Sequence, residues 1–174
     1  MRLPPLALPL AVLVTLTACV PAPNQSRQEG TVAPTDAPLF ASDAEALAAA
    51  EEVYREYLRV SSEIDTSAGV DDLAPFVTAT WLSNERKSRD DFESRGVHTE
   101  GQAGVRWVEL QSREADAVSV YVCLDLATTR LVDVDGVDVT PNDRGSEGLL
   151  LVRLKAPDQH LLVDWSELWS KHCS

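Results

Sequence analysis

Basic residues are scarce in this chain of 174 residues. Lys and Arg together number 15 against 28 Asp and Glu, which gives a formal net charge of −13 at pH 7. Nucleic-acid recognition rests on Lys and Arg at phosphates, so an acidic excess of this size argues against nucleic acid as a partner. The same charge repels an anionic leaflet, and we expect a folded domain to stand off from such a membrane.

Histidine is also sparse, and its three copies do not suggest a metal site. His98, His160 and His172 share no metal-ligand spacing. No Cys or carboxylate lies four residues from any of them in a pattern typical of zinc. We therefore predict no metal and no cofactor, with all three histidines at the surface.

The eight glycines form no phosphate-binding loop, and two other sequence patterns also fail. Gly145-Ser146-Glu147-Gly148 lacks the Gly-x-Ser-x-Gly spacing of a nucleophile elbow. A calcium-binding EF-hand that began at Asp133 would need glycine at position 138 and glutamate at position 144. The chain has Asp138 and Arg144 there, so a hairpin tip is the better interpretation.

The chain has one apolar run, and it is too short to span a bilayer comfortably. Leu6 to Leu16 follows Arg2 in the manner of a signal peptide. Leu16-Thr17-Ala18-Cys19 comes directly afterwards and resembles the bacterial lipobox, in which the cysteine thiol receives a diacylglyceryl group. The resemblance implies a lipoprotein signal peptide over residues 1–18 and lipid attachment at Cys19. An ordinary secretory signal is the alternative.

Residues 19–41 are expected to join the lipid to the folded part. Four prolines stand among small polar residues without any periodic apolar pattern, which is typical of a disordered tether. Two or three acyl chains anchor stably because each buried methylene contributes roughly 0.8 kcal/mol. The expected location is the extracytoplasmic face of the cell membrane, with one folded domain over residues 42–174.

Only three cysteines are present. If Cys19 carries the lipid, Cys123 and Cys173 remain as an even pair in an oxidising compartment. A bridge between them would close about 50 residues and add roughly 4 kcal/mol of stability in the chain-entropy model. We predict this disulfide. The alternative is one buried thiol and one thiol at a frayed C-terminus.

Three helices are predicted in the first half of the folded part. The capping-box pattern Ser42-Asp43-Ala44-Glu45 starts a long helix with a wide apolar stripe. Val70 to Val77 is predicted as a short second helix. Trp81 to Arg95 is predicted as a third, with Thr80 or Ser83 as its N-cap.

The second half shows the alternation that is typical of strands. The most regular stretch is Ala117 to Asp133, where every even position from Val118 to Leu126 is apolar, and we predict a central strand there with one apolar face and one mixed face. Asp135-Gly136 lies between valines and indicates a hairpin. Further strands are predicted over residues 105–112, 149–154 and 161–169, the second of these in a central position because both its faces are apolar.

Helices followed by antiparallel strands indicate an α+β fold. Tyr54-Arg55-Glu56-Tyr57-Leu58 and Leu161-Leu162-Val163-Asp164-Trp165-Ser166 are similar to the first-helix and closing-strand patterns of the NTF2-like, or SnoaL-like, superfamily. This resemblance covers residues 42–174. It implies a cone of three N-terminal helices packed on a curved antiparallel sheet, with a pocket at the open end. Family members often dimerise through the sheet.

The resemblance does not extend to the catalytic position of the family's isomerases. Those relatives use an acidic base just after the second helix, where this chain has Thr78-Ala79-Thr80. No catalytic residue is therefore predicted. Five side chains are candidates for the lining of the pocket: Trp81, Trp107, Tyr121, Asp125 and Trp165.

Asp125 is the best candidate for a carboxylate in this pocket. Burial would raise its pKa and suit it to act as a general base. The alternative is that Asp125 lies at the surface and is bonded to Arg130 or Arg106. The four aromatic candidates have an alternative too, because aromatic residues at such spacing often just fill the core of a sheet.

The sequence thus predicts a lipid-anchored extracytoplasmic module for binding or assembly, without catalytic activity. Two kinds of partner besides the membrane stay open. One is an envelope protein that docks on the exposed sheet face, and the other is an apolar small molecule in the pocket, with vestigial isomerase or hydrolase chemistry. A purely structural envelope protein is a third interpretation.

Overall fold

The computed structural model of the chain describes residues 38–64 and 69–174. The chain divides into two units, residues 1–34 and residues 35–174, and the described residues all belong to the second. The predicted signal peptide, Cys19 and nearly all of the predicted tether lie outside the described residues. No helix within the described ranges has both the length and the apolarity to cross a membrane.

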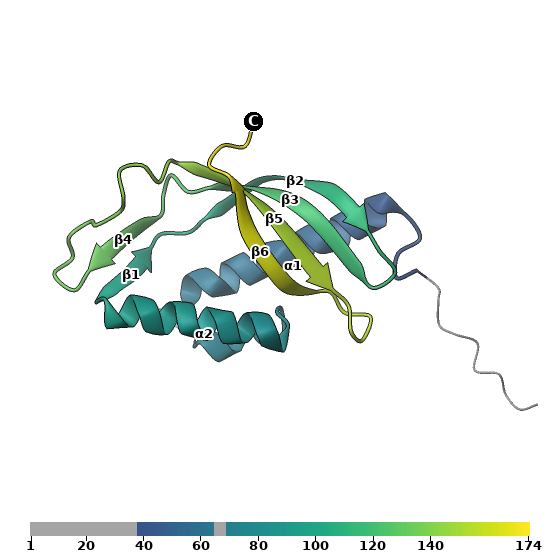
Figure 1. Cartoon of the computed structure of the whole chain (residues 1–174), viewed down its shortest axis with the longest axis horizontal. Coiled ribbons are helices and arrows are strands. Elements are labelled where there is room, and N and C mark those ends of the chain that lie inside the picture. Colours follow the sequence, from purple (N-terminus) through teal and green to yellow (C-terminus); the bar gives the residue numbers. More distant parts are fainter. Residues whose placement is uncertain (1–37, 65–68) are drawn as a thin grey trace, which may run out of the picture. The chain divides into compact units, whose positions relative to one another are not determined.

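Helices come first in the described part and strands follow, as expected of an α+β fold (Figure 1). Two α-helices, α1 (Asp43–Glu63) and α2 (Ala79–Ser94), are separated by the 3₁₀-helix η1 (Val70–Leu73). The strands are β1 (Val97–Glu100), β2 (Gly104–Arg113), β3 (Ala117–Asp125), β4 (Arg130–Asp133), β5 (Glu147–Lys155) and β6 (Leu162–Ser170). The larger sheet has the order β2-β3-β5-β6 and is antiparallel throughout, and β1 pairs with β4 in a second, two-stranded sheet.

The capping box begins α1 as predicted. Ser42 Oγ accepts a hydrogen bond from the Glu45 amide at 3.2 Å, and the Glu45 carboxylate accepts one from the Ala41 amide at 2.8 Å. These bonds satisfy amide groups that a helix start otherwise leaves without partners. The buried stripe of α1 consists of Ala46, Ala50, Tyr54, Tyr57 and Val60.

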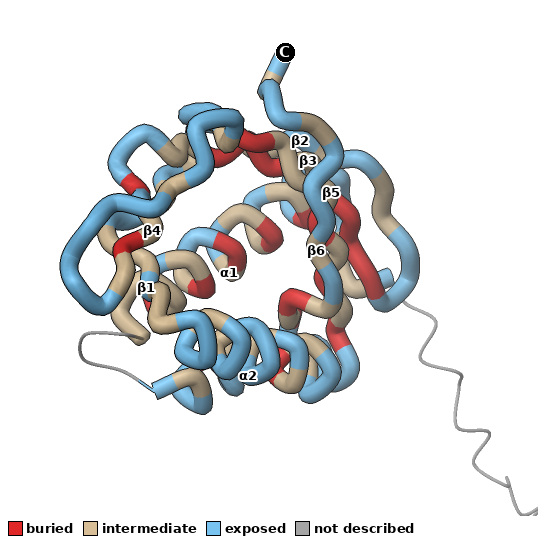
Figure 2. The backbone as a smooth tube through the Cα atoms, turned by 60° about the vertical axis from the view of Figure 1, so that its left-hand side comes forward, coloured by how far each residue is buried: buried red, intermediate tan, exposed pale blue. Residues whose placement is uncertain are grey.

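The even positions of β3 form the centre of the core, also as predicted. Val118, Val120 and Val122 are at most 1% exposed, and they belong to one buried cluster with the apolar stripe of α1. Figure 2 shows buried segments both in α1 and in the larger sheet. Strand β5 lies between β3 and β6, which agrees with its two apolar faces. Both helices pack on the face of the sheet that carries these valines, which we call the inner face. The valines and α1 therefore bury one another.

The predicted second helix is wrong in length, and the described part of the chain has two α-helices in place of the three packed helices expected. Only Val70–Leu73 is helical, and it is a 3₁₀ turn. Pro75 has no amide hydrogen to continue a helix. Residues 76–78 bond instead to Val163 of β6: the Val163 amide donates to Phe76 O at 2.8 Å, and the Thr78 amide donates to Val163 O at 2.9 Å.

Three smaller expectations are also corrected. The third helix begins at Ala79 and its N-cap is Thr78, whose Oγ1 accepts from the Trp81 amide, so neither Thr80 nor Ser83 is the cap. The central strand ends at Asp125, and the chain turns before β4. The glycines at positions 96, 101 and 104 predict loops around His98, but this stretch forms β1, because its partner β4 supplies the hydrogen bonds from at least 30 residues away.

Candidate functional site

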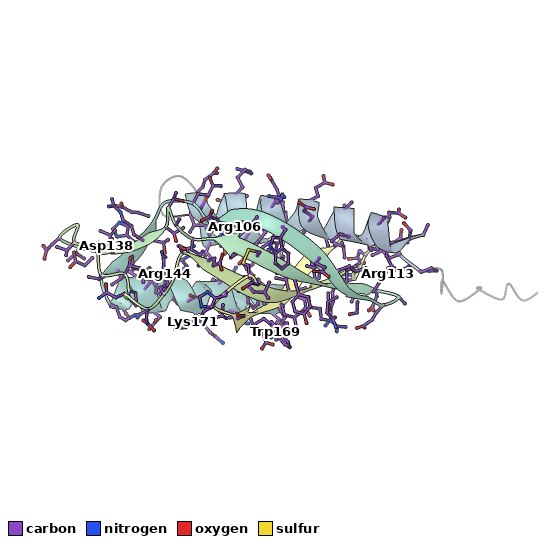
Figure 3. The ribbon with its side chains drawn as sticks, turned by 90° about the horizontal axis from the view of Figure 1, so that it is seen from above. Arg106, Arg113, Asp138, Arg144, Trp169 and Lys171 are labelled. Atoms are coloured by element: carbon purple, nitrogen blue, oxygen red, sulfur yellow. A yellow bond between two sulfur atoms is a disulfide. The ribbon has the colours of Figure 1, made fainter. Side chains whose placement is uncertain are left out.

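The sheet face opposite the two helices is the larger of two candidate sites. We call it the outer face; no described helix packs on it, and the C-terminal residues lie against it at the Cys123–Cys173 bridge (Figures 1 and 3). Its apolar side chains are Trp107, Tyr121, Leu149, Leu151, Trp165 and Trp169. Trp165 is 38% exposed and Trp169 is 56% exposed. The Tyr121 and Trp169 rings lie 5.6 Å apart, so aromatic groups from β3 and β6 gather at one place on this face.

Two carboxylates flank the centre of the outer face. The strand register puts Glu109, Tyr121, Leu151 and Glu167 in one row across β2, β3, β5 and β6. Both glutamates are exposed, and neither forms an ion pair with a described residue. The centre of this surface is therefore apolar and its two sides are negatively charged.

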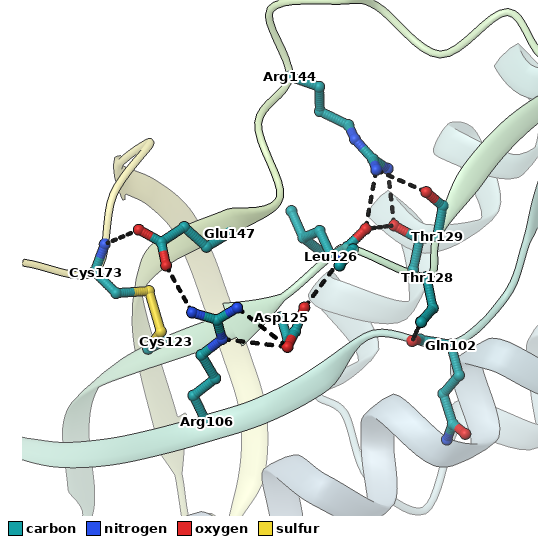
Figure 4. Close-up of polar contacts among 11 residues, drawn as sticks. Gln102, Arg106, Cys123, Asp125, Leu126, Thr128, Thr129, Arg144, Glu147 and Cys173 are labelled. Carbon is teal, nitrogen blue, oxygen red and sulfur yellow. Dashed lines mark hydrogen bonds and ion pairs between the residues drawn. A yellow bond between two sulfur atoms is a disulfide. The ribbon is translucent and has the colours of Figure 1, made fainter.

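Asp125 lies at the end of β3 in an ion-pair network (Figure 4). Its Oδ2 accepts from Arg106 at 3.2 Å, and Arg106 Nη1 also donates to Glu147 at 2.9 Å. The Ala127 amide and then Arg106 hold the pKa of Asp125 below its usual value. The raised pKa expected of a general base is therefore wrong, and the alternative of a surface pair with Arg106 is correct.

The predicted disulfide between Cys123 and Cys173 is confirmed. Their Cα atoms lie 5.5 Å apart, and Cys123 is fully buried in β3. The Cys173 amide also donates to Glu147 at 3.2 Å, so the bridge and this bond fasten the C-terminus to the outer face. Cys123, Cys173 and Glu147 offer ligand atoms within 4.8 Å of one another, but both sulfurs are engaged in the bridge and do not make a metal site.

The second candidate site is a cavity of about 300 Å³ at the C-terminal end of α1, which we call the end cavity. It lies between α1, α2, the β1–β2 connection and the β3–β4 turn. Its lining is Leu58, Ser61, Ser62, Arg89, Phe92, Thr99, Gly101, Ala103, Leu126, Thr129, Leu131 and Arg144. A neighbouring groove of about 510 Å³ shares Arg89 and Phe92 with it and adds Glu93, His98 and Val134.

Arg144 holds the turn that forms one wall of the end cavity (Figure 4). Its Nη2 donates to Leu126 O at 3.0 Å and to Thr129 O at 2.6 Å, and its Nη1 donates to Thr129 Oγ1 at 2.8 Å. The turn also crosses Gly101 closely: a Cβ there would lie 2.0 Å from Thr128 O, and the φ of Gly101 is +84°. Only glycine fits this crossing.

The five residues predicted to line a pocket separate into two groups. Trp107, Tyr121 and Trp165 lie together on the outer face, and Asp125 lies at its edge. Trp81 belongs to α2 on the inner side of the sheet, where its Nε1 donates to Tyr57 Oη at 3.4 Å. None of the five is among the residues that line the end cavity.

Sequence reasoning missed the charged residues of the end cavity. Arg89 falls in a helix segment with the composition of a charged surface, and Arg144 falls in a polar loop. Neither position carries a motif. The three histidines all have exposed or partly exposed positions, and His98 and His172 lie 3.5 Å and 3.7 Å from Glu100 and Glu147.

No protein-family model and no curated protein matches this chain. Among solved structures, it is similar to the intermembrane space region of the chloroplast protein ARC6, with 9% identity, 70% of this chain and 95% of that chain covered, and a TM-score of 0.49. It is also similar to Aln2 from a Streptomyces species, with 11% identity, 73% and 91% covered, and a TM-score of 0.46. A de novo β-sheet design has 14% identity, 72% and 88% covered, and a TM-score of 0.36. With TM-scores under 0.5, these similarities carry no functional conclusion.

Proposed function

We propose that this protein is a lipid-anchored binding module without catalytic activity on the extracytoplasmic face of the cell membrane. In this proposal residues 1–18 are a lipoprotein signal peptide, and Cys19 carries the lipid. Residues 20–41 are the tether, and an NTF2-like cone follows from residue 42. The lipobox-like sequence and the proline-containing segment after it support the anchor. The order of one long helix, a second helix and an antiparallel sheet supports the cone.

The observation that carries the binding function is the uncovered, aromatic outer face. Aromatic side chains are enriched at the centres of protein interfaces, where they provide most of the binding energy. The carboxylates of Glu109 and Glu167 stand on either side of this apolar centre without ionic partners among the described residues. We therefore propose a protein partner with an apolar patch that is flanked by Lys or Arg. A second copy of this chain fits less well, since it would bring more negative charge to the same surface.

Binding without turnover is supported by the state of the acidic groups. Asp125 is ionised and engaged by Arg106, so it is a poor base. The end cavity is lined by apolar, hydroxyl and arginine side chains, and the described residues of its lining include no Asp, Glu, His or Cys. Such a lining offers no general acid or base near neutral pH.

The end cavity favours a second candidate function, the binding of a small apolar molecule. Its volume lies at the lower end of the range for small-molecule sites. Leu58, Phe92, Leu126 and Leu131 give it an apolar interior. This function is compatible with docking through the outer face because the two sites lie on opposite faces of the sheet.

Docking is tested on the full-length protein extracted from the membranes of its own host with mild detergent. The outer-face variant Trp165→Ser/Trp169→Ser is compared with Val134→Ser/Val137→Ser, which removes two exposed apolar side chains from the β4 hairpin tip. We expect the wild type and the hairpin-tip variant to elute in a complex, and the outer-face variant to elute alone. A wild-type protein that elutes alone, or at twice its own mass, contradicts the proposed partner.

The anchor is tested separately by membrane fractionation. Cys19→Ala should move the protein from the membrane pellet to the soluble fraction, because the acyl chains supply the membrane affinity. Ser26→Ala, in the same segment, is the control and should stay in the pellet. If Cys19→Ala also stays in the pellet, the lipid anchor is wrong.

A further inference from the structure

We propose that the end cavity binds a small amphipathic anion, with an apolar body between α1 and α2 and a single carboxylate at Arg144. This inference rests on the second candidate function, ligand binding in the end cavity, and is independent of docking through the outer face. The volume and the apolar walls of the cavity do not define the chemical class of the ligand, and the charged residues of the lining do.

The first observation is the sign of the charge in the cavity. The chain has almost twice as many acidic as basic residues. Among the described residues that line the end cavity, the charged ones are nonetheless Arg89 and Arg144, and none is Asp or Glu. The described lining is therefore cationic in an otherwise acidic protein. Arg89 is already engaged by other residues, so the anion is assigned to Arg144.

The second observation is the bonding of Arg144. Among the described residues, its guanidinium group donates only to neutral oxygens, those of Leu126 and Thr129. Its Nε–H is buried and has no hydrogen-bond partner in the described part of the chain. The hydrogen bonds from Thr140 and, after them, nearby charges that include Arg144 lower the pKa of Asp138. No described carboxylate forms an ion pair with Arg144. A carboxylate in the cavity would supply the negative partner that Arg144 lacks.

The third observation is the arrangement of polar and apolar groups around this cation. The side chains of Leu58, Phe92 and Leu131 come from α1, α2 and β4 and form apolar walls. Thr129 and Arg144 stand at the β3–β4 turn, which the close crossing of Gly101 over Thr128 fixes in place. A ligand with an apolar body and one charged end matches the apolar walls and the single cation at the turn. A fully apolar or a highly charged ligand does not.

The test uses the full chain with Cys19→Ala, which avoids detergent in the cavity. Three probes of the same shape are titrated by calorimetry at pH 7: 4-butylbenzoate, 4-butylbenzyl alcohol and 4-butylbenzylamine, which are anionic, neutral and cationic. We expect the carboxylate to bind at least tenfold more tightly than the alcohol, and the amine to bind most weakly. Equal affinities for the carboxylate and the alcohol would overturn the anion proposal and leave ligand binding intact. Failure of all three probes to bind would overturn both.

Variants test whether the carboxylate of the ligand binds at Arg144. Arg144→Gln should lower the affinity for 4-butylbenzoate about tenfold and leave the affinity for the alcohol unchanged, which also reports that the cavity is still folded. Arg144→Lys keeps the charge and should retain most of the preference. Leu131→Trp fills the cavity and should abolish the binding of every probe. An unchanged preference in Arg144→Gln, or unchanged carboxylate binding in Leu131→Trp, would overturn the assignment. If Arg144→Gln no longer binds the alcohol either, Arg144→Lys decides between the alternatives. A preference for the carboxylate that persists in Arg144→Lys supports the assignment, and loss of that preference overturns it.

Discussion

The replacement Cys173→Ser removes the disulfide with little other change. Cys173 lies near the C-terminus and is partly exposed, whereas its partner Cys123 is fully buried and stays in place as a thiol. The amide of residue 173 can still donate to Glu147. The main consequence of the replacement is therefore that the unfolded chain is no longer cross-linked.

The size of the effect follows from the separation of the two cysteines, which is 50 residues. Closing a loop of this length in the unfolded state corresponds to about 4 kcal/mol at 25 °C in the chain-entropy model. With an unfolding entropy of roughly 2.1 cal/mol/K per residue over about 133 residues, this free energy lowers the melting temperature by about 14 °C.

Urea unfolding followed by tryptophan fluorescence measures the change in free energy, and non-reducing mass spectrometry confirms the bridge in the wild type. Cys19→Ala is the matched control, because it replaces a cysteine outside the bridge and should leave the unfolding free energy unchanged. A loss below about 1 kcal/mol in Cys173→Ser would contradict the loop-closure explanation, since the cross-link would then constrain the unfolded chain far less than its loop length implies.

Three further predictions concern single side chains. Because the pKa of Asp125 is lowered on folding, its ionised form stabilises the fold above the pKa of the unfolded state, and this stability is lost as the pH falls through the folded pKa. Asp125→Asn should therefore be destabilised at pH 7 and approach the wild type in urea unfolding series as the pH falls below the ordinary Asp pKa of ~3.9 and through the lowered pKa of the folded state. Gly101→Ala should cost on the order of 3 kcal/mol, measured in the same way, because of its positive φ and the close approach of Thr128 O. Thr78→Ala should lower stability by about 1 kcal/mol and Thr80→Ala by much less, because Thr78 is the N-cap of α2.

A specific result would contradict each of these predictions. A difference between Asp125→Asn and wild type that does not change with pH would show that the ionised carboxylate is not responsible. The matched control for Gly101→Ala is Gly69→Ala, where the added Cβ meets nothing within 4 Å. Equal costs at positions 101 and 69, or at positions 78 and 80, would contradict the assignment of these contacts.

Local patterns predicted much of the fold. The alternation in residues 118–124 predicted a central strand with one apolar face, and its even positions are buried. Ser119 and Cys123 on the other face are buried as well, which the alternation does not indicate. The capping box at Ser42 predicted the start of α1, since its hydrogen bonds involve neighbours in the sequence. The cysteine count predicted the disulfide for a different reason, which is that only one pair remained.

Contacts between distant residues explain the errors. The segment 70–77 has a helical pattern but bonds to Val163 of β6, almost 90 residues later. Strand β1 is four residues long and lacks alternation, so only its pairing with β4 defines it. Periodicity within a short window contains no information about either partner.

The candidate sites show the same difference between local patterns and contacts of distant residues. The aromatic residues of the outer face were recognised from their spacing, but the spacing could not tell which face of the sheet the helices cover. Arg144 reaches the end cavity from a loop without any pattern, and its role depends on the turn at Leu126–Thr129 folding back beneath it. The sequence could therefore supply candidate residues for docking but not the cation of the cavity.

Site-specific photo-crosslinking tests the docking surface most directly. A benzophenone amino acid is placed at position 169 on the outer face or at position 87 on the exposed side of α2, in the lipidated full-length protein in living cells. We expect one cross-linked protein from position 169, at a site next to Lys or Arg of that protein, and none from position 87. Cross-links from position 87 alone, equal cross-links from both positions, or none from position 169 would contradict it.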